Sequence, residues 1–128
     1  MKDIIHDLPN KAEINILIDQ TVSIVGDKWS LHLIGVLAFG KSPIRFNELL
    51  RVLKPISSRT LSIKLAKLVE HGIIAKKIEN ASPPYTTYSL TQKGRDLIGA
   101  LNAMAEWYQK WYGRLPSVPQ ITDTLQSK

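Results

Sequence analysis

The sequence predicts a mainly helical α+β fold, and three observations support this class. Apolar residues recur at helical spacing in several segments, a pair of strand-like segments flanks a proline turn, and a long helical segment follows the second strand. The 128 residues suit one domain with extensions. Seven glycines and seven prolines are close to average usage, which excludes collagen-like and low-complexity proteins.

The first two predicted helices meet at a Gly-Asp pair at positions 26–27. A capping box from Asn10 to Glu13 precedes apolar residues that repeat at helical spacing from Ile14 to Val25. The glycine ends this helix, and Asp27 is suited to cap a second helix over 28–39. The second helix is apolar on nearly all sides, so we expect it at the centre of the core.

Two shorter helices come next. The third is predicted over 47–53 and ends at the Lys54-Pro55 pair, because the residue before a proline is disfavoured in a helix. Ser57 or Ser58 caps a fourth helix that runs to His71, and the glycine after it suits a left-handed stop. Two helices joined by such a tight turn are typical of a helix-turn-helix.

A hairpin and a last long helix complete the order of elements. The β-branched segment 73–79 and the alternating segment 85–90 are predicted strands, joined by a turn over 80–84. Thr91 is a good N-cap for a helix that reaches about Gly113. A helix-turn-helix followed by a two-stranded ribbon is a winged helix-turn-helix, here with long N- and C-terminal helices that we assign to dimerisation.

This order gives one domain with two extensions. We expect a winged-helix DNA-binding and dimerisation domain over 14–113, an N-terminal extension over 1–13 and a flexible C-terminal tail over 114–128. The longest uncharged stretch of interest, Trp29 to Gly40, has 12 residues and is too short to span a bilayer. The first residues lack the features of a signal peptide, so we expect a cytoplasmic protein with no membrane partner.

The positive charge is concentrated in one third of the chain. Residues 40–77 hold nine of the 17 basic residues and two of the 11 acidic ones, a net charge of +7, while the rest carries −1. Charge alone fits either a solvated basic surface or a face that binds a polyanion. Because this third coincides with the helix-turn-helix and the first strand of the wing, it favours double-stranded DNA as the partner.

The fourth helix is the predicted recognition helix. Its leucines at 61, 65 and 68 form one stripe toward the core, which leaves the opposite side for the major groove. The base-reading candidates are Ser57, Ser58, Arg59, Thr60, Ser62 and Ile63. Arg59 is the strongest, because a guanidinium can bind a guanine edge with two hydrogen bonds. The remaining DNA-binding candidates are Lys64 and Lys67 as phosphate contacts, Lys76 and Lys77 leading into the wing, and Arg45.

A linked series of motifs resembles one known family. The motifs are Gly26-Asp27-Lys28-Trp29, Arg45-Phe46-Asn47-Glu48-Leu49, Ile56-Ser57 with Leu61 and Leu65, Gly72-Ile73-Ile74, Pro84, Tyr88 to Thr91, and Gly94. Together they cover roughly 22–112 and resemble the HxlR family of winged-helix transcription regulators, which is related to the MarR group. The resemblance implies a homodimeric bacterial or archaeal regulator that binds an inverted repeat, with the segment 57–67 as the reading helix.

Two features depart from the pattern of that family. Many members carry a cysteine before the first helix, which some use to sense electrophiles or oxidants; this chain has no cysteine, which excludes that mode. The wing strand of the family usually has a base just after its proline and a glutamate before its aromatic residue. This chain has Tyr85 and Thr87 instead, so the usual wing contact with phosphate lacks its basic residue.

The last helix carries a pattern of its own. Apolar residues step by four and three positions, which is the spacing of a coiled-coil seam. With two residues of the first helix, they form the predicted homodimer interface: Leu97, Leu101, Met104, Tyr108 and Trp111, with Leu17 and Ile18. Packing onto the chain's own domain is the alternative. Two-fold symmetry would place the two recognition helices about 34 Å apart, one turn of duplex.

Enzyme chemistry finds little support in the sequence. The histidines, His6, His32 and His71, are far apart, and no zinc-protease motif or glycine-rich phosphate loop is present. We expect His32 to be a core residue of the apolar second helix, and we expect no catalytic residue, metal or cofactor. A small-molecule effector pocket at the dimer seam remains open, near Trp29, Trp107 and Trp111.

Three functions are compatible with these observations. The first is a sequence-specific transcriptional regulator that acts as a homodimer on an inverted-repeat operator. The second is a non-specific, chromatin-type architectural protein with the same wing fold. The third is a winged-helix protein-interaction module whose basic face meets an acidic partner. The recognition-helix pattern favours the first.

Overall fold

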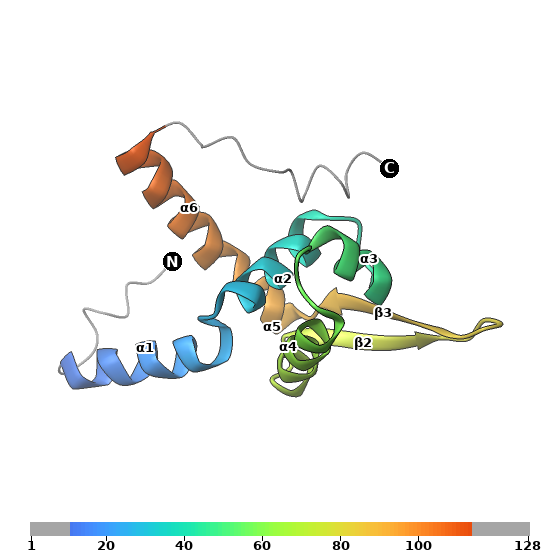
Figure 1. Ribbon diagram of the computed structural model, residues 1–128. Helices are drawn as coiled ribbons and strands as arrows, with labels where there is room; N and C mark the ends of the chain where they lie inside the picture. Colours follow the sequence, from blue (N-terminus) through green and yellow to red (C-terminus); the bar gives the residue numbers. More distant parts are fainter. Residues whose placement is uncertain (1–10, 114–128) are drawn as a thin grey trace.

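The computed structural model describes residues 11–113 and confirms the mainly helical winged helix-turn-helix (Figure 1). In chain order the elements are α1 (Lys11–Val25), α2 (Lys28–Phe39), β1 (Ile44–Arg45), α3 (Phe46–Val52), α4 (Ser58–Glu70), β2 (Ile74–Glu79), β3 (Tyr85–Leu90), α5 (Gln92–Arg95) and α6 (Ile98–Tyr112). The expected boundaries of the first four helices and of both strands hold to within one residue, apart from the start of α1, which lies at Lys11. Asn10 of the expected capping box and the expected tail 114–128 lie outside the described residues.

The sheet has three antiparallel strands, one more than the sequence predicts. The strand order is β1-β3-β2, with Ile44 opposite Tyr88 and Ile74 opposite Leu90. The additional strand, β1, is only two residues long. Such a segment is too short to show an alternating pattern, so only its pairing with β3 reveals it. This pairing fixes the start of α3 against the wing.

Helix α2 lies at the centre of the core, as its apolar sequence predicts. Leu33 and Ile34 are fully buried, and the leucine stripe of α4 packs in the same cluster. The three leucines of that stripe, Leu61, Leu65 and Leu68, are between 0 and 2% exposed. Burying such side chains contributes about 1.5–3 kcal/mol each. The stripe therefore fixes which side of α4 faces away from the protein.

The single long helix expected after the hairpin is interrupted. Thr91 caps the first part as predicted, since its side-chain oxygen accepts a hydrogen bond from the Gly94 N–H at 3.1 Å. Helix α5 then ends at Arg95, and the Leu97 N–H donates to the Gly94 carbonyl at 3.1 Å in a turn of the 3₁₀ type. The close packing of Gly94 on the Ile73 carbonyl ties α5 to the sheet, so α6 starts anew at Ile98.

Helices α1 and α6 extend away from the rest of the domain, on the side opposite the tip of the hairpin (Figure 1). Between residues 11 and 113, no single helix is long and apolar enough to cross a membrane. Helices α1 and α2 meet that criterion only as a pair, by length and composition, and they are bent by 74° at their junction. The second member of the pair is the buried core helix.

Candidate nucleic-acid interface

The outward face of α4 is organised by a cap at its first turn. Ser57 is the N-cap: its Oγ accepts a hydrogen bond from the Thr60 N–H at 3.0 Å and donates one to the Thr60 Oγ1 at 3.0 Å. The side chains of Ser57 and Thr60 therefore fix the start of the helix. The other exposed side chains of α4 are Ser58, Arg59, Ser62, Ile63, Ala66 and, at its end, Glu70.

Arg59 and Ile63 lie on one exposed ridge of this face. They are four residues apart, so they are neighbours on the helix surface. Ile63 is 54% exposed. Within residues 11–113 the guanidinium of Arg59 has neither an ion pair nor a hydrogen bond. The structure thus presents a cation and an apolar side chain together at the front of α4.

The two lysines of α4 are placed differently from Arg59. The Lys64 Nζ lies 3.1 Å from Asp27 Oδ2, and the Lys67 Nζ lies 3.6 Å from Asp27 Oδ1. Both lysine side chains are partly buried, at 25% and 30% exposure. They reach toward the N-terminus of α2, although their positions in the sequence suggested phosphate contacts. The carboxylate of Asp27 is already their partner.

Asp27 is held in place by α2 as well as by the lysines. Its Oδ2 accepts a hydrogen bond from the Ser30 N–H at 3.1 Å, and its Oδ1 accepts one from the Ser30 hydroxyl at 2.7 Å. Partial burial by itself raises the pKa of Asp27, but the hydrogen bonds from Ser30 and Lys64 outweigh it and hold that pKa well below its usual range. The group is therefore ionised at neutral pH.

The wing presents two further lysines. Lys76 and Lys77 are exposed on β2, and the Lys77 side chain is 75% exposed although its Nζ lies 3.4 Å from Glu79 Oε1. An ion pair at such an exposed position is weak and easily exchanged for another anion. Ile78 beside them is 69% exposed. The sequence placed both lysines at the wing, and the structure agrees.

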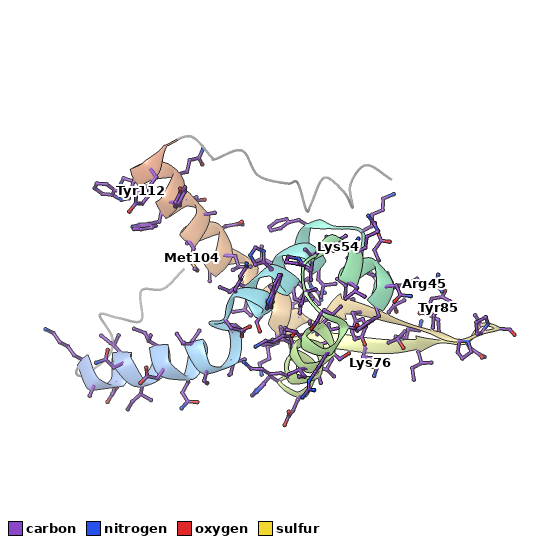
Figure 2. The ribbon with its side chains drawn as sticks, in the orientation of Figure 1. Arg45, Lys54, Lys76, Tyr85, Met104 and Tyr112 are labelled. Carbon is purple, nitrogen blue, oxygen red and sulfur yellow. The ribbon has the colours of Figure 1, made fainter. Side chains whose placement is uncertain are left out.

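Arg45 lies against the wing through an aromatic contact that the sequence did not predict. Its guanidinium carbon is 3.6 Å from the centroid of the Tyr85 ring, which is within the range of a cation–π interaction (Figure 2). Arg45 itself is an expected DNA-binding residue, but its partner is not. The only sign of this contact in the sequence was Tyr85 itself, which stands where the family usually has a basic residue.

A second exposed surface lies on α1 and α6. The expected interface residues Leu17, Ile18, Met104, Tyr108 and Trp111 are between 40 and 67% exposed. The other two expected residues, Leu97 and Leu101, are partly buried and pack against the core of the same chain. Further exposed apolar residues beside these seven join this surface: Ile16, Val22, Trp107 and Tyr112.

Aromatic side chains dominate the α6 part of that surface. The Tyr108 and Tyr112 rings stack with centroids 4.9 Å apart, and Trp107 meets Tyr112 edge to face at 5.9 Å. Met104 and Tyr112 project from α6 at a distance from the winged domain (Figure 2). So large an exposed apolar surface is typical of a protein–protein contact.

A groove lies where α6 meets α2, but it differs from the expected effector pocket. Its volume is 320 Å³, and its lining comprises Leu31, His32, Gly35, Val36, Phe39, Leu101, Asn102 and Ala105. Trp29, Trp107 and Trp111 are absent from this lining. The expectation that His32 is a core residue is wrong: it is exposed at the groove, because it lies on the one side of α2 that the core does not cover. In the part of the chain from 11 to 113, no three metal-ligating side chains gather.

Comparison with known proteins agrees with this geometry. Residues 24–116 match the HxlR-like helix-turn-helix family. An uncharacterized HTH-type transcriptional regulator of Halalkalibacterium halodurans, BH0655, is 39% identical over 87 residues, which cover 68% of this chain and 76% of that protein. The uncharacterized HTH-type transcriptional regulator YdeP of Bacillus subtilis is 34% identical over 98 residues, which cover 77% of this chain and 75% of that protein.

Solved structures show the same arrangement. A transcriptional regulator of the MarR family from Enterococcus faecalis superimposes with a TM-score of 0.69 at 30% identity, covering 77% of this chain and 87% of the other. The redox regulator HypR in its oxidized form superimposes with a TM-score of 0.67 at 31% identity, covering 79% and 98%. The family match spans the winged helix-turn-helix described above. The chain therefore belongs to the HxlR-like helix-turn-helix family of DNA-binding transcriptional regulators.

Proposed function

We propose that this regulator binds an inverted-repeat operator as a homodimer, with α4 of each protomer in the major groove. The observation that carries the proposal is the exposed ridge of α4, where Arg59 has no partner among residues 11–113 and Ile63 is 54% exposed. A recognition helix reads bases with its first turns, and Arg59 is the second residue of α4. The proposed activity is binding rather than catalysis.

Base readout is assigned to the front of α4. The Arg59 guanidinium suits a guanine edge, and the Ile63 side chain suits a thymine methyl group. The hydroxyl groups of Ser58 and Ser62 are exposed beside them. Ser57 and Thr60 are engaged with each other at the cap, so we assign them the placing of the helix on the duplex.

Phosphate binding is assigned to the wing and to the start of α3. Lys76, Lys77 and Arg45 are exposed there, with Arg45 and Lys77 both opposite Thr87 of β3 and Lys76 opposite Tyr88. Backbone contacts of this kind fix the register of a protein on DNA without reading its sequence. Lys64 and Lys67 are paired with Asp27, and we leave them out of this set.

Dimerisation is assigned to the apolar surface of α1 and α6. Both helices project from the domain, so a second copy can cover their exposed residues without moving α4 or the wing. Two-fold symmetry then sets two copies of α4 about 34 Å apart, which matches successive major grooves on one side of a duplex. We place this regulator in the prokaryotic cytoplasm, where operator DNA lies; BH0655, YdeP and the Enterococcus faecalis regulator come from bacteria.

The test of the proposal is Arg59→Ala, measured against a cognate duplex and against random-sequence DNA. We expect the cognate affinity to fall by about 1–3 kcal/mol and the random-sequence affinity to fall far less. Lys11→Ala, which removes one positive charge at the exposed first residue of α1 and is neither a DNA-binding candidate nor a named interface residue, is the control and should change neither affinity. Equal losses on both duplexes would show that Arg59 binds the backbone and reads no base.

A further inference from the structure

Asp27 connects the core helix α2 with α4, the helix that is proposed to enter the major groove. It stands at the junction of α1 and α2, and its carboxylate also meets both lysines of α4. The Lys64 contact at 3.1 Å and the Lys67 contact at 3.6 Å use different oxygens of the carboxylate. One acidic group therefore occupies two cations of the recognition helix.

The negative charge of Asp27 exceeds what its cap requires. Asparagine and serine cap helices about as well as aspartate, because a cap needs only an oxygen that accepts a backbone N–H. An uncharged acceptor would satisfy the Ser30 N–H and leave both lysines without an ion pair from position 27. The charge has a consequence for α4 that the cap does not explain.

The surroundings of the carboxylate would suit a phosphate. Two ammonium groups converge there, and the N-terminal end of the 12-residue helix α2 adds its positive dipole. A backbone phosphate beside α4 would seek the same groups. In this chain the carboxylate of Asp27 lies where such a phosphate would bind, between the two lysines and the start of α2.

We propose that Asp27 is a specificity-determining residue: it acts as an internal substitute for phosphate and withholds Lys64 and Lys67 from non-specific DNA. The inference rests on the proposed function, in which α4 faces the duplex. Non-specific binding is almost entirely electrostatic and adds up every free cation. In the operator complex, base contacts contribute binding free energy that a random sequence does not offer. Holding the two lysines against Asp27 therefore weakens non-specific binding by a larger fraction than it weakens operator binding.

The decisive variant is Asp27→Asn, which keeps an N-cap and removes the charge. We expect it to bind random-sequence duplex several-fold more tightly than the wild type at low salt, with a salt dependence steeper by about one to two units. The ratio of operator affinity to random-sequence affinity should fall. Asp27→Ser is the second variant, in case asparagine disturbs the fold, and it should behave in the same way.

The lysines supply the matched controls. In a Lys64→Gln, Lys67→Gln background, Asp27→Asn should no longer steepen the salt dependence, because no lysine is left to release. The same double substitution in the wild-type chain should leave the random-sequence salt slope unchanged, whereas Lys77→Gln should lower it by about one unit. A lowered slope in the double variant would show that both lysines already bind phosphate, and would overturn the inference.

The outcomes also separate this inference from the proposed function. Wild-type protein that binds no duplex at low salt would overturn both. Wild-type protein that binds its operator, together with a folded Asp27→Asn variant of unchanged or shallower salt slope, would overturn only the role of Asp27. Folding is checked in each case by the cooperativity of thermal unfolding.

Discussion

The guanidinium carbon of Arg45 lies 3.6 Å from the centroid of the Tyr85 ring. Arg45 belongs to β1, and its register partner on β3 is Thr87, two residues beyond the tyrosine. Arg45 therefore places a cation beside the start of β3, although that strand itself begins with a tyrosine where the family usually has a basic residue. The contact joins the short strand β1 to the tyrosine at the start of β3.

Substitutions at this pair test whether Tyr85 positions Arg45 for DNA. Arg45→Gln should weaken binding to all duplexes alike and lower the salt slope by about one unit, because one phosphate contact is lost. Tyr85→Leu should weaken binding by roughly two- to fivefold, since an exposed cation–π contact contributes about 0.5–1 kcal/mol. Tyr85→Phe keeps the ring and should bind like the wild type. If Tyr85→Leu bound DNA with wild-type affinity, Tyr85 would have no role in positioning Arg45 for DNA.

The exposed aromatic surface of α6 leads to a prediction about oligomeric state. Trp111 is 67% exposed in the single chain, so Trp111→Glu should leave the fold of each protomer intact and disrupt the dimer. Light scattering should then give a mass near the 14.4 kDa of one chain. Leu101 is a poorer probe, because it also packs against the core of its own chain.

The control for this prediction is Gly99→Glu on the same helix. A Cβ at Gly99 meets no atom within 4 Å, and by helical spacing the residue lies away from the aromatic stripe. This variant should remain dimeric while adding the same charge. A dimer that persists in Trp111→Glu would place the interface on another surface.

The ionisation of Asp27 predicts a dependence of stability on pH. Its pKa in the folded chain is lower than the value near 3.9 expected in the unfolded chain, so protons bind first to the unfolded state as the pH falls. The contribution of the charge is fully present above about pH 4 and is lost as the pH falls below that value toward the folded pKa. The difference in free energy of unfolding between wild type and Asp27→Asn, measured by urea titration, should therefore shrink below about pH 4. A difference that stays constant down to pH 3 would contradict the assigned ion pairs.

Elements fixed by local patterns were predictable from the sequence. The leucine stripe of α4, the caps at Asp27 and Thr91, and the stop at Gly72, where φ is +71°, follow from helical periodicity and capping chemistry. The break between α5 and α6 was missed because Asp96 and Leu97 keep helical backbone angles, and only the turn geometry separates the two helices.

Contacts of the candidate interface were less predictable than its location. Helical spacing shows on which side of α4 a lysine begins, but a long side chain reaches partners that only the tertiary fold brings near. Lys64 and Lys67 therefore appeared as phosphate contacts, while the fold places Asp27 beside them. Arg59 and Ile63 project from the helix as the spacing predicted, because no other element between residues 11 and 113 covers that ridge.

Selection of bound duplexes from a random library, followed by affinity measurements across salt concentrations, tests the central claim most directly. A homodimeric regulator should recover an inverted repeat whose half-sites are one duplex turn apart and bind it about 10³-fold or more tightly than bulk DNA. Steep salt dependence without enrichment of any sequence would contradict this account and favour an architectural DNA-binding protein.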